Sequence, residues 1–207
     1  MFSGIVAGVG EVLFVHDQDA IRSLIVKLPK ETEKNLEIGA SIAVNGVCLT
    51  ATKIEKQEVS FDVLSETCQK TNLGSIKKGE KINIERSLCL GGEIGGHLLS
   101  GHISSTCEIA NIERKGANTI WTIECSFLWR KYLFPKGFVA LDGASLTLVD
   151  VSENGFFTVH LIPETLSSTT FSNKKVGDSL NLEIEAQTQA TVDTIERILE
   201  KRDLFVV

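Results

Sequence analysis

The sequence predicts an all-β chain of two similar halves, each folded as a small closed barrel, with one α-helix at the C-terminal end. Three observations support this prediction. The chain matches itself after a shift of 97 or 98 positions, short apolar segments alternate with a period of two, and the last segment changes to a helical period. A sandwich of two sheets is the alternative for each half, and the sequence separates these architectures poorly.

The repeat is a collinear series of matches between the two halves. Ser3-Gly4 matches Ser100-Gly101, and the segment NGVCLT at 45–50 matches DGASLT at 142–147. Further matches follow in order at 65–67 and 163–165, at 71 and 169, at 77–79 and 175–177, and at 83–85 and 181–183. The change of offset predicts one residue of slippage between Gly39/Gly137 and Gly46/Gly143. The predicted units are residues 1–90 and 98–186, and the glycine-rich segment between them is interpreted as a flexible joint.

Within each half, turn signals and alternating segments predict strands. Asn45-Gly46 and Asp142-Gly143 can both reach positive φ and stand between apolar segments, which predicts a hairpin at each. Segments 59–63 and 81–85 alternate apolar with polar residues, as half-buried strands do. About six such strands in each half favour a closed barrel. Short helical segments are expected around 31–36 and 126–133.

After Glu185 the pattern becomes helical, which predicts an amphipathic helix in residues 187–207. Its apolar stripe consists of Val192, Ile195, Ile198 and Leu199. Asp193 and Glu196 have the spacing of a capping box at a helix start. An apolar stripe outside both halves either packs back on one of them or joins subunits, and the sequence leaves both alternatives open.

Composition and charge narrow the class of protein. The 207 residues are 43% hydrophobic and 23% charged, which is typical of a globular protein. The net charge of −6 argues against nucleic acid and against an anionic membrane surface as partners. The apolar N-terminal segment follows no basic residue and is interrupted by Glu11, so neither a secretory signal nor a membrane span is expected. Five cysteines without a C-x-x-C pair favour reduced thiols in the cytoplasm over disulfides or a zinc site.

Positions at which the repeats differ are candidates for catalysis, because structural residues of a duplicated fold should match in both copies. Cys48 matches Ser145, so a thiol in one copy is a hydroxyl in the other. Ile5 matches His102, so an apolar position becomes an imidazole, which titrates near neutrality and is suited to act as a base. A third position of this kind pairs Asp62 with His160.

Each candidate also has a structural interpretation. Cys48 could be a small buried apolar residue, and His97 and His102, which flank the start of the second copy, could be hydrogen-bonded structural residues. The pairs Glu66-Thr67 and Glu164-Thr165 occur in both copies. Their repetition suits shared ligand recognition, or strand ends that cap a neighbouring turn.

Five segments, in this order, resemble the riboflavin synthase family over nearly the whole chain. They are MFSGIV at 1–6, NGVCLT at 45–50, GGHLLSGHI at 95–103, DGASLTL at 142–148 and HLIPETL at 160–166. The resemblance implies two tandem six-stranded Greek-key barrels per chain and a homotrimer joined by the C-terminal helices. The active site would lie between the first barrel of one subunit and the second barrel of another.

The same resemblance implies a transferase that catalyses the final step of riboflavin biosynthesis. Two molecules of 6,7-dimethyl-8-ribityllumazine would dismutate by four-carbon transfer, giving riboflavin and 5-amino-6-ribitylamino-pyrimidinedione. Neither a metal nor an organic cofactor is expected. An association with lumazine synthase is left open by the sequence.

Roles for single residues also come from the resemblance. Cys48 is a candidate nucleophile toward C7 of one lumazine, or an orienting group. His102 with Ser145 and Thr147 would remove a proton from the 7-methyl group of the other lumazine. Three further polar positions of the family site match Ser41, Lys136 and Asp142. Which barrel holds the donor lumazine and which the acceptor is not decided.

Two ring pockets, with contacts to the ribityl hydroxyls, are expected from matching segments of the repeats. The residues expected to line them are Gly4, Ile5, Val6, Cys48, Leu49, Thr50, Asp62, Val63, Leu64, Ser65, Glu66, Thr67, His97, Gly101, His102, Ile103, Lys136, Ser145, Leu146, Thr147, His160, Leu161, Ile162, Pro163, Glu164 and Thr165.

Two other classes of protein remain as rivals. An antenna protein of the same duplicated fold would bind lumazine or flavin without turning it over, and it is expected to lack the histidine pair and the repeated Glu-Thr, which this chain has. A flavin-binding barrel of a reductase would need a nicotinamide-binding domain, and the sequence has no βαβ pattern.

Overall fold

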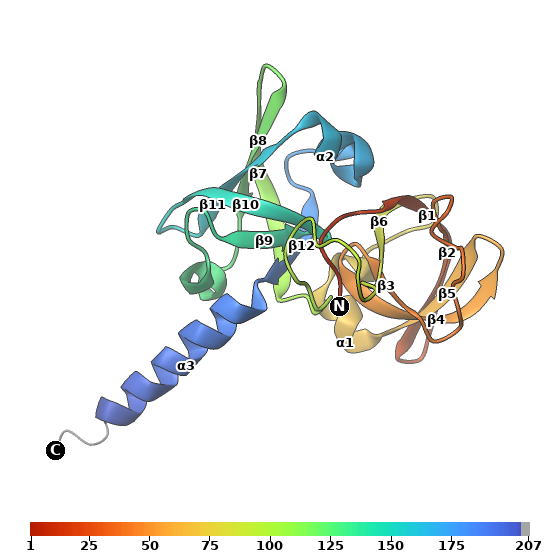
Figure 1. Cartoon of the computed structure of the whole chain (residues 1–207), viewed down its shortest axis with the longest axis horizontal. Helices are drawn as coiled ribbons and strands as arrows, with labels where there is room; N and C mark the ends of the chain where they lie inside the picture. Colours follow the sequence, from red (N-terminus) through yellow and green to blue (C-terminus); the bar gives the residue numbers. More distant parts are fainter. Residues whose placement is uncertain (204–207) are drawn as a thin grey trace.

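The computed structural model describes residues 1–203 and contains two closed antiparallel barrels of six strands each, followed by a helix (Figure 1). The first barrel has the order β1-β2-β5-β4-β3-β6. Its strands are β1 (Gly8–Gln18), β2 (Ile21–Lys27), β3 (Ser41–Val44), β4 (Val47–Glu55), β5 (Glu58–Leu64) and β6 (Lys81–Arg86). The barrel alternative is therefore correct, and the sandwich is not formed.

The second barrel repeats this topology, since its closed order β7-β8-β11-β10-β9-β12 is that of the first barrel, strand for strand. Its strands are β7 (Ser105–Lys115), β8 (Asn118–Glu124), β9 (Phe138–Leu141), β10 (Ala144–Val151), β11 (Phe156–Leu161) and β12 (Ser179–Ile184). The predicted duplication is confirmed in three dimensions.

Each barrel closes around its own apolar core. Alternate residues of β5 point inward, so that Val59, Phe61 and Val63 are buried while the residues between them are not. In the second barrel the largest fully buried side chains are Trp121, Phe157 and Phe171, and the ring centroids of Trp121 and Phe171 lie 4.9 Å apart. Closure pairs every strand of the two barrels on both sides, so within residues 1–203 neither sheet presents an open edge for aggregation.

The two predicted hairpins are present, and their turns touch each other. Asn45 and Gly46 have φ values of +46° and +80°, and Asp142 and Gly143 have +42° and +82°, so both turns use two left-handed residues. A Cβ atom built on Gly46 would lie 2.7 Å from the backbone nitrogen of Gly143. The two glycines therefore let the barrels meet backbone to backbone at a local pseudo-twofold axis.

The segments that precede the two barrels pair with each other at this junction. Phe2 and Leu99 exchange two backbone hydrogen bonds, of 2.8 and 3.0 Å. Both side chains are buried, and they form a small cluster with Ala43 and Ala140, one residue from each barrel. The N-terminus consequently lies between the barrels and not at the far end of the first (Figure 1).

A network of buried amides crosses the junction with the same symmetry. Asn83 of β6 donates from Nδ2 to the carbonyl of Asp142 (3.0 Å), and Asn181 of β12 donates from Nδ2 to the carbonyl of Asn45 (2.8 Å). The Oδ1 atom of each asparagine accepts a backbone N–H from the segment that follows the short helix of the other barrel. Each barrel thus satisfies polar backbone groups of its partner.

Four expectations about local structure need correction. Residues 31–36 are not helical but form turns, because Glu31 and Asn35 adopt left-handed φ values of +76° and +53° that interrupt any helix. By contrast, the expected helical segment around 126–133 is present as the 3₁₀-helix η2 (Phe127–Tyr132). Two short helices that were not predicted follow β5 and β11, namely α1 (Ser65–Lys70) and α2 (Pro163–Ser168). A 3₁₀ turn follows each, η1 (Asn72–Gly74) and η3 (Thr170–Asn173).

The position of the slippage is the second correction. The N–H of Gly39 donates to the carbonyl of Ala51 (2.8 Å), and the N–H of Lys136 donates equivalently to Leu148 (2.9 Å), so the offset is already 97 at these residues. Ile54 pairs with Val59, whereas Val151 pairs with Phe157. The extra residue therefore lies in the β10–β11 hairpin, where a longer turn is accommodated at the barrel surface.

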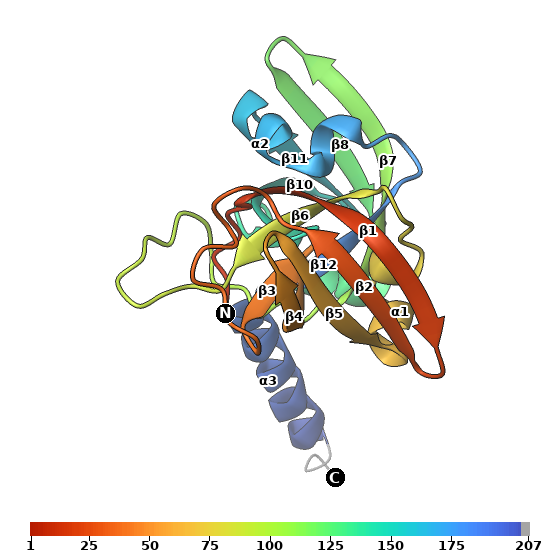
Figure 2. The same ribbon diagram turned by 90° about the vertical axis from the view of Figure 1, so that its right-hand side faces the viewer.

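The third correction concerns the connecting segment. Between β6 and β7 the chain loops outward past both barrels (Figure 2), and Leu90 is fully exposed. The end of this segment is packed, because a Cβ atom on Gly96 would lie 2.4 Å from the carbonyl oxygen of Ser3 and 2.6 Å from Cβ of Ser145. Only the first part of the segment, around Leu90 and Gly91, is unpacked as the sequence interpretation expected.

The fourth correction concerns the start of the C-terminal helix α3 (Ala186–Asp203). Glu185 accepts the N–H of Thr188 (3.3 Å) and is the residue that caps the helix. Asp193 lies inside the helix and accepts a hydrogen bond from the Tyr132 hydroxyl instead of capping. Residues 204–207 of the expected helical segment lie outside the described residues.

The first half of α3 lies against the second barrel. Val192 packs against the core of that barrel, and Glu196 forms an ion pair with Lys131 of η2. The rest of the apolar stripe is about half exposed, at 51% for Ile195 and 53% each for Ile198 and Leu199. The C-terminal part of the helix projects away from both barrels (Figure 1).

Loss of one junction amide should measurably destabilise the protein. We expect Asn181→Ala to lower the free energy of unfolding by about 1–3 kcal/mol, because two buried backbone groups lose their partner. Urea unfolding followed by tryptophan fluorescence gives this value. The control is Asn118→Ala at the exposed start of β8, where a change within about 0.5 kcal/mol is expected. Equal losses in both variants would contradict a stabilising role of the junction.

Candidate active site

A cavity of about 270 Å³ on the first barrel brings together several of the expected site residues. Its walls come from the start of β4, from α1 and from the segment that leads into β7. The lining residues are Val47, Cys48, Glu66, Thr67, Lys70, Thr71, Gly101, His102 and Ile103. Six of these nine, including Cys48 and His102, were expected from the sequence to contact a ligand.

Cys48 lies at the start of β4, directly after the hairpin turn, and is half-buried with a free thiol. Its N–H donates to the carbonyl of Gly101 (3.0 Å). Gly101 has a φ of +79°, and a Cβ atom on it would lie 2.5 Å from the Cβ atom of Cys48. The close approach therefore requires glycine at 101, and it leaves room only for a small side chain at 48.

The segment that carries His102 is held from the second barrel. Glu183 of β12 accepts hydrogen bonds from the N–H and the hydroxyl of Ser100 (both 2.8 Å) and from the N–H of Gly101 (3.2 Å). Ile103 packs against the core of the first barrel. Between these two anchors the His102 side chain is exposed at the mouth of the cavity.

The other copy of this arrangement lies on the second barrel. The N–H of Ser145 donates to the carbonyl of Gly4 (2.9 Å), which has a φ of +76°. Glu85 accepts from the N–H of Ser3 (2.6 Å), its hydroxyl (2.7 Å) and the N–H of Gly4 (3.1 Å), and Val6 packs against the second core. Each pre-barrel segment thus crosses to the barrel that it does not precede.

The imidazole that contacts Ser145 is that of His97, not that of His102. Nδ1 of His97 lies 2.6 Å from Oγ of Ser145 within a hydrogen bond, and the imidazole stacks on the Phe138 ring with centroids 5.1 Å apart. Burial lowers the pKa of His97, against an opposing effect of the nearby Glu185, and so favours the neutral ring. Nε2 of His97 is buried without a hydrogen-bond partner among the described residues.

The expected group of His102 with Ser145 and Thr147 is therefore not formed within one chain. His102 lies beside Cys48 on the first barrel, while Ser145 lies beside His97 on the second. Thr147 is exposed on β10 opposite Phe138. The cause is the crossing of the pre-barrel segments, which a comparison of matching positions in the repeats does not reveal.

Asp142, which was expected to be a polar residue of the active site, lies in the junction between the barrels and does not line the Cys48 cavity. It is fully buried in the junction, where its Oδ1 accepts from the N–H of Asn181 (2.8 Å) and from Nδ2 of Asn72 (2.8 Å), and Nζ of Lys174 lies 3.0 Å from its Oδ2. Burial raises the pKa of Asp142, and the Lys174 ammonium acts in the opposite direction. Ser41, which opens β3 opposite Thr50, does not line the Cys48 cavity, and neither does Lys136.

Several expected lining residues point the other way. Leu49, Val63, Leu146 and Leu161 are buried in the barrel cores, because side chains alternate along a strand and their neighbours face outward. Their backbone alone can take part in a site. On the outward face are Leu64, which is 61% exposed, and Ile162, which is 54% exposed.

The remaining expected residues lie on the outer surface or in the short helices. Thr50 and Asp62 are exposed on the first barrel, where Asp62 accepts from the hydroxyl of Ser23 (2.8 Å). His160 is exposed on β11, and Ile5 is 50% exposed. Ser65 begins α1, and Pro163, Glu164 and Thr165 form the first turn of α2.

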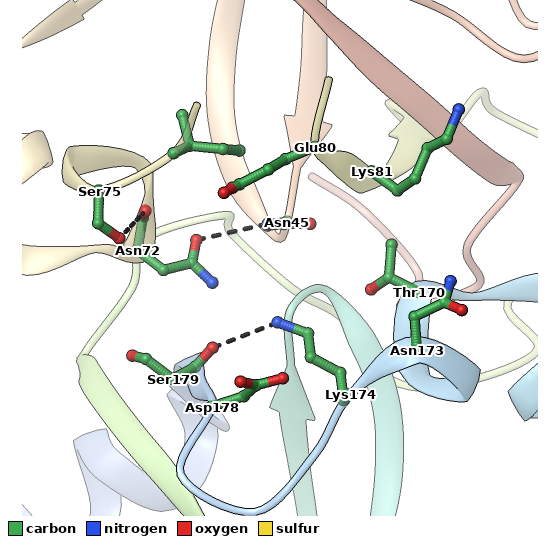
Figure 3. A pocket seen from close by; sticks show the side chains of 11 residues that line it. Asn45, Asn72, Ser75, Glu80, Lys81, Thr170, Asn173, Lys174, Asp178 and Ser179 are labelled. Carbon is green, nitrogen blue, oxygen red and sulfur yellow. Dashed lines mark hydrogen bonds between the residues drawn. The ribbon is translucent and has the colours of Figure 1, made fainter. Parts of the chain in front are cut away.

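A larger cavity, of about 440 Å³, lies between the two barrels but is lined by none of the expected site residues. Figure 3 shows its polar walls, with Lys174 directed toward Ser179 and Asn72 toward Asn45. The side chains of Asn45 and Asn72 bond to each other, and Lys174 bonds to the backbone carbonyl of Ser179 and pairs with Asp142 of the junction. The smaller cavity therefore carries the candidate chemistry, because a thiol, an imidazole and a carboxylate converge there.

Comparisons of the sequence with known proteins find the same family over both halves of the chain. The model of the lumazine binding domain matches residues 3–87 and again residues 100–185. The riboflavin synthase of Escherichia coli strain K12 is 46% identical over 204 residues, which cover 98% of this chain and 95% of that protein. Those of Chlamydia pneumoniae and Bacillus subtilis strain 168 are 44% and 37% identical, covering 96% and 89% of this chain and 97% and 85% of their own.

Among solved structures, LumP in complex with riboflavin superposes with a TM-score of 0.83 at 22% identity, covering 89% of this chain and all of that one. LumP in complex with 6,7-dimethyl-8-(1'-D-ribityl) lumazine gives 0.81, also at 22% identity, covering 89% of this chain and 99% of that one. At this identity the comparison shows a shared fold.

Proposed function

Because this chain belongs to the riboflavin synthase family and carries the lumazine binding domain twice, we propose that it converts two molecules of 6,7-dimethyl-8-ribityllumazine into riboflavin and 5-amino-6-ribitylamino-pyrimidinedione. The arrangement around Cys48 carries this function. A thiol on the first barrel and an imidazole that precedes the second barrel border one cavity, with the Glu66-Thr67 pair opposite them.

The duplicated fold suits a reaction between two copies of one substrate. The junction relates the segment around Gly101 and Cys48 to that around Gly4 and Ser145, so two identical ligands would bind in related orientations. Holding two reactants together turns a bimolecular encounter into a unimolecular step, which is worth several orders of magnitude in rate. We place one lumazine at each barrel.

Each barrel offers different chemical groups to its ligand. In our proposal Cys48 attacks or orients one lumazine at C7, and His102 is the base for the 7-methyl proton of the lumazine that it faces. Ser145 and His97, whose burial lowers its pKa, offer hydrogen-bonding groups to the second ring. Because His102 and Ser145 lie on different barrels, they would act on one substrate pair only where two subunits bring unlike barrels together.

A non-catalytic antenna protein is the second candidate, favoured by the fold that this chain shares with LumP. Three features count against it here. His97 and His102 are both present, the Glu-Thr pair occurs in both copies, and His102 lies exposed at the mouth of a cavity beside Cys48.

Turnover distinguishes the two candidates directly. We expect purified protein, incubated with the lumazine alone, to produce one riboflavin for every two lumazines consumed, without added metal or cofactor. Flavin fluorescence and chromatography of both products measure this ratio. Binding of the lumazine without flavin formation would establish the antenna function and remove the enzyme from consideration.

A single substitution tests the proposed base. We expect His102→Gln to lower turnover by about 10²–10⁴-fold, because the general base is lost while the rest of the cavity wall remains. Exchange of the 7-methyl protons with deuterated solvent should slow in parallel, and lumazine binding should change little. Unchanged exchange together with a lower thermal midpoint would identify His102 as a structural residue.

We also propose that the chain assembles as a homotrimer in the cytoplasm. Support for assembly comes from the exposed half of the α3 stripe, which projects from the second barrel with no apolar surface of its own chain to cover it among residues 1–203. Support for a reducing compartment comes from the five free cysteines. No helix in the described range is long and apolar enough to cross a bilayer. An association with lumazine synthase stays a prediction.

The helix prediction can be tested without loss of the barrel contact. We expect the double variant Ile195→Glu, Ile198→Glu to dissociate the oligomer into monomers, because two charges are placed in a buried apolar interface. Light scattering gives the mass. Truncation after Glu185 should have the same effect, whereas Glu200→Lys on the charged face serves as the control. An oligomer that survives truncation would show that α3 only covers the second barrel.

A further inference from the structure

The carboxylate of Glu183 is buried and forms no ion pair with a residue in the described part of the chain. Its side chain belongs to a residue that is only 4% exposed, and its partners are the N–H and hydroxyl of Ser100 and the N–H of Gly101. Burial raises the pKa of Glu183, and the hydrogen bonds from Ser100 and Gly101 and the charge of His102 act in the opposite direction. Burial of a carboxylate costs free energy, which these hydrogen bonds offset in part.

Those hydrogen bonds lead directly to His102. The Ser100 hydroxyl donates to Glu183 and accepts from the N–H of His102 (3.1 Å). The adjacent Gly101 carbonyl accepts from the N–H of Cys48. Glu183 therefore orients the peptide group before Gly101 directly, and the peptide group after Gly101 through the Ser100 hydroxyl.

The imidazole has no other anchor in the described part of the chain. The only hydrogen bond of His102 there is through its backbone N–H, and its side chain is exposed. The place from which the imidazole reaches toward Cys48 is therefore set by the backbone of the segment that carries it. Ile103 holds this backbone on one side by packing on the first core, and the hydrogen bonds of Ser100 and Gly101 to Glu183 hold it on the other.

We propose that Glu183 is a positioning residue of the second barrel, which holds the His102 segment against Cys48 on the first barrel. It rests on the proposed function, in which His102 is the base. Glu183 acts through Ser100 and touches neither substrate nor reacting atom.

The duplication supplies a matched control. Glu85 holds Ser3 and Gly4 with the same set of hydrogen bonds, and it is similarly buried at 5%. The residue that follows in this copy is Ile5, which has no group to titrate. Glu85→Gln therefore removes an equivalent buried carboxylate without acting through His102, and general damage to the junction would affect both variants alike.

A double-mutant cycle measures the coupling between Glu183 and His102. We expect Glu183→Gln to lower kcat by about 10- to 100-fold with KM changed much less, since a shift of about 1 Å in a catalytic group has a cost of this order. In the His102→Gln background the same substitution should lower kcat by less than about 3-fold. Glu85→Gln should lower kcat by the same factor in both backgrounds. Equal losses from Glu183→Gln in both backgrounds would overturn the proposal.

A second measurement does not depend on turnover. Gly101 covers the Cβ atom of Cys48, so release of the segment should expose the thiol. We expect iodoacetamide to alkylate Cys48 several-fold faster in Glu183→Gln than in the unsubstituted protein or in Glu85→Gln, as read by peptide mass spectrometry, which separates Cys48 from the exposed Cys89. Equal rates in the two glutamine variants would also overturn the proposal.

Two further cases keep the outcomes separate. If Glu183→Gln does not fold, Ser100→Ala replaces it, because this variant removes only the hydroxyl that links Glu183 to His102. The loss of kcat from Ser100→Ala should again depend on the presence of His102. An equal loss in both backgrounds would contradict the relay. If the unsubstituted protein makes no flavin, the proposed function fails. Selective alkylation of Cys48 in Glu183→Gln would then still support positioning, and equal alkylation would reject it.

Discussion

The contact on which the rest of the structure depends is the meeting of two hairpin turns. Gly46 and Gly143 approach so closely that a Cβ atom on either would overlap the backbone of the other. This contact brings the backbones of the two turns together and thereby sets the distance between the barrels. Because the barrels are so close, the buried amides Asn83 and Asn181 can reach backbone groups on the far side, and the segments at Phe2 and Leu99 can pair.

Close approach also explains why the candidate site is shared between the barrels. A pre-barrel segment only has to span a short gap to lie on the opposite barrel, so Gly101 reaches Cys48 and Gly4 reaches Ser145. The buried carboxylates Glu183 and Glu85 hold these crossings from behind. Duplication has thus produced two copies of one scaffold whose corresponding positions, His102 and Ile5, can differ in chemistry while the backbone that carries them stays the same.

Local features of this fold could be predicted from the sequence, and features that depend on contacts distant in sequence could not. The hairpins were predictable because Asn-Gly and Asp-Gly tolerate left-handed φ, and the strands because one face of each is buried. Residues 31–36 have the composition of a helix but form turns, because Glu31 and Asn35 adopt left-handed φ values that composition does not indicate. The grouping of Ser145 with His97, and the burial of Asp142 beside Lys174, follow from how the barrels dock, which leaves no periodic signal in either half.

The crossing of the segments imposes an order in which contacts can form while the chain is synthesised at the ribosome. The contact of residues 97–104 with Cys48 can form soon after the first barrel is translated, but their anchor Glu183 is made only at the end of the second barrel. Residues 1–6 can bond early to Glu85 of the first barrel, whereas their contact with Ser145 waits for the second barrel, which is finished at Ile184. At about 5–20 residues per second this is a wait on the order of ten seconds. During that time the small apolar cluster of Phe2, Ala43 and Leu99 lacks Ala140, its member from the second barrel.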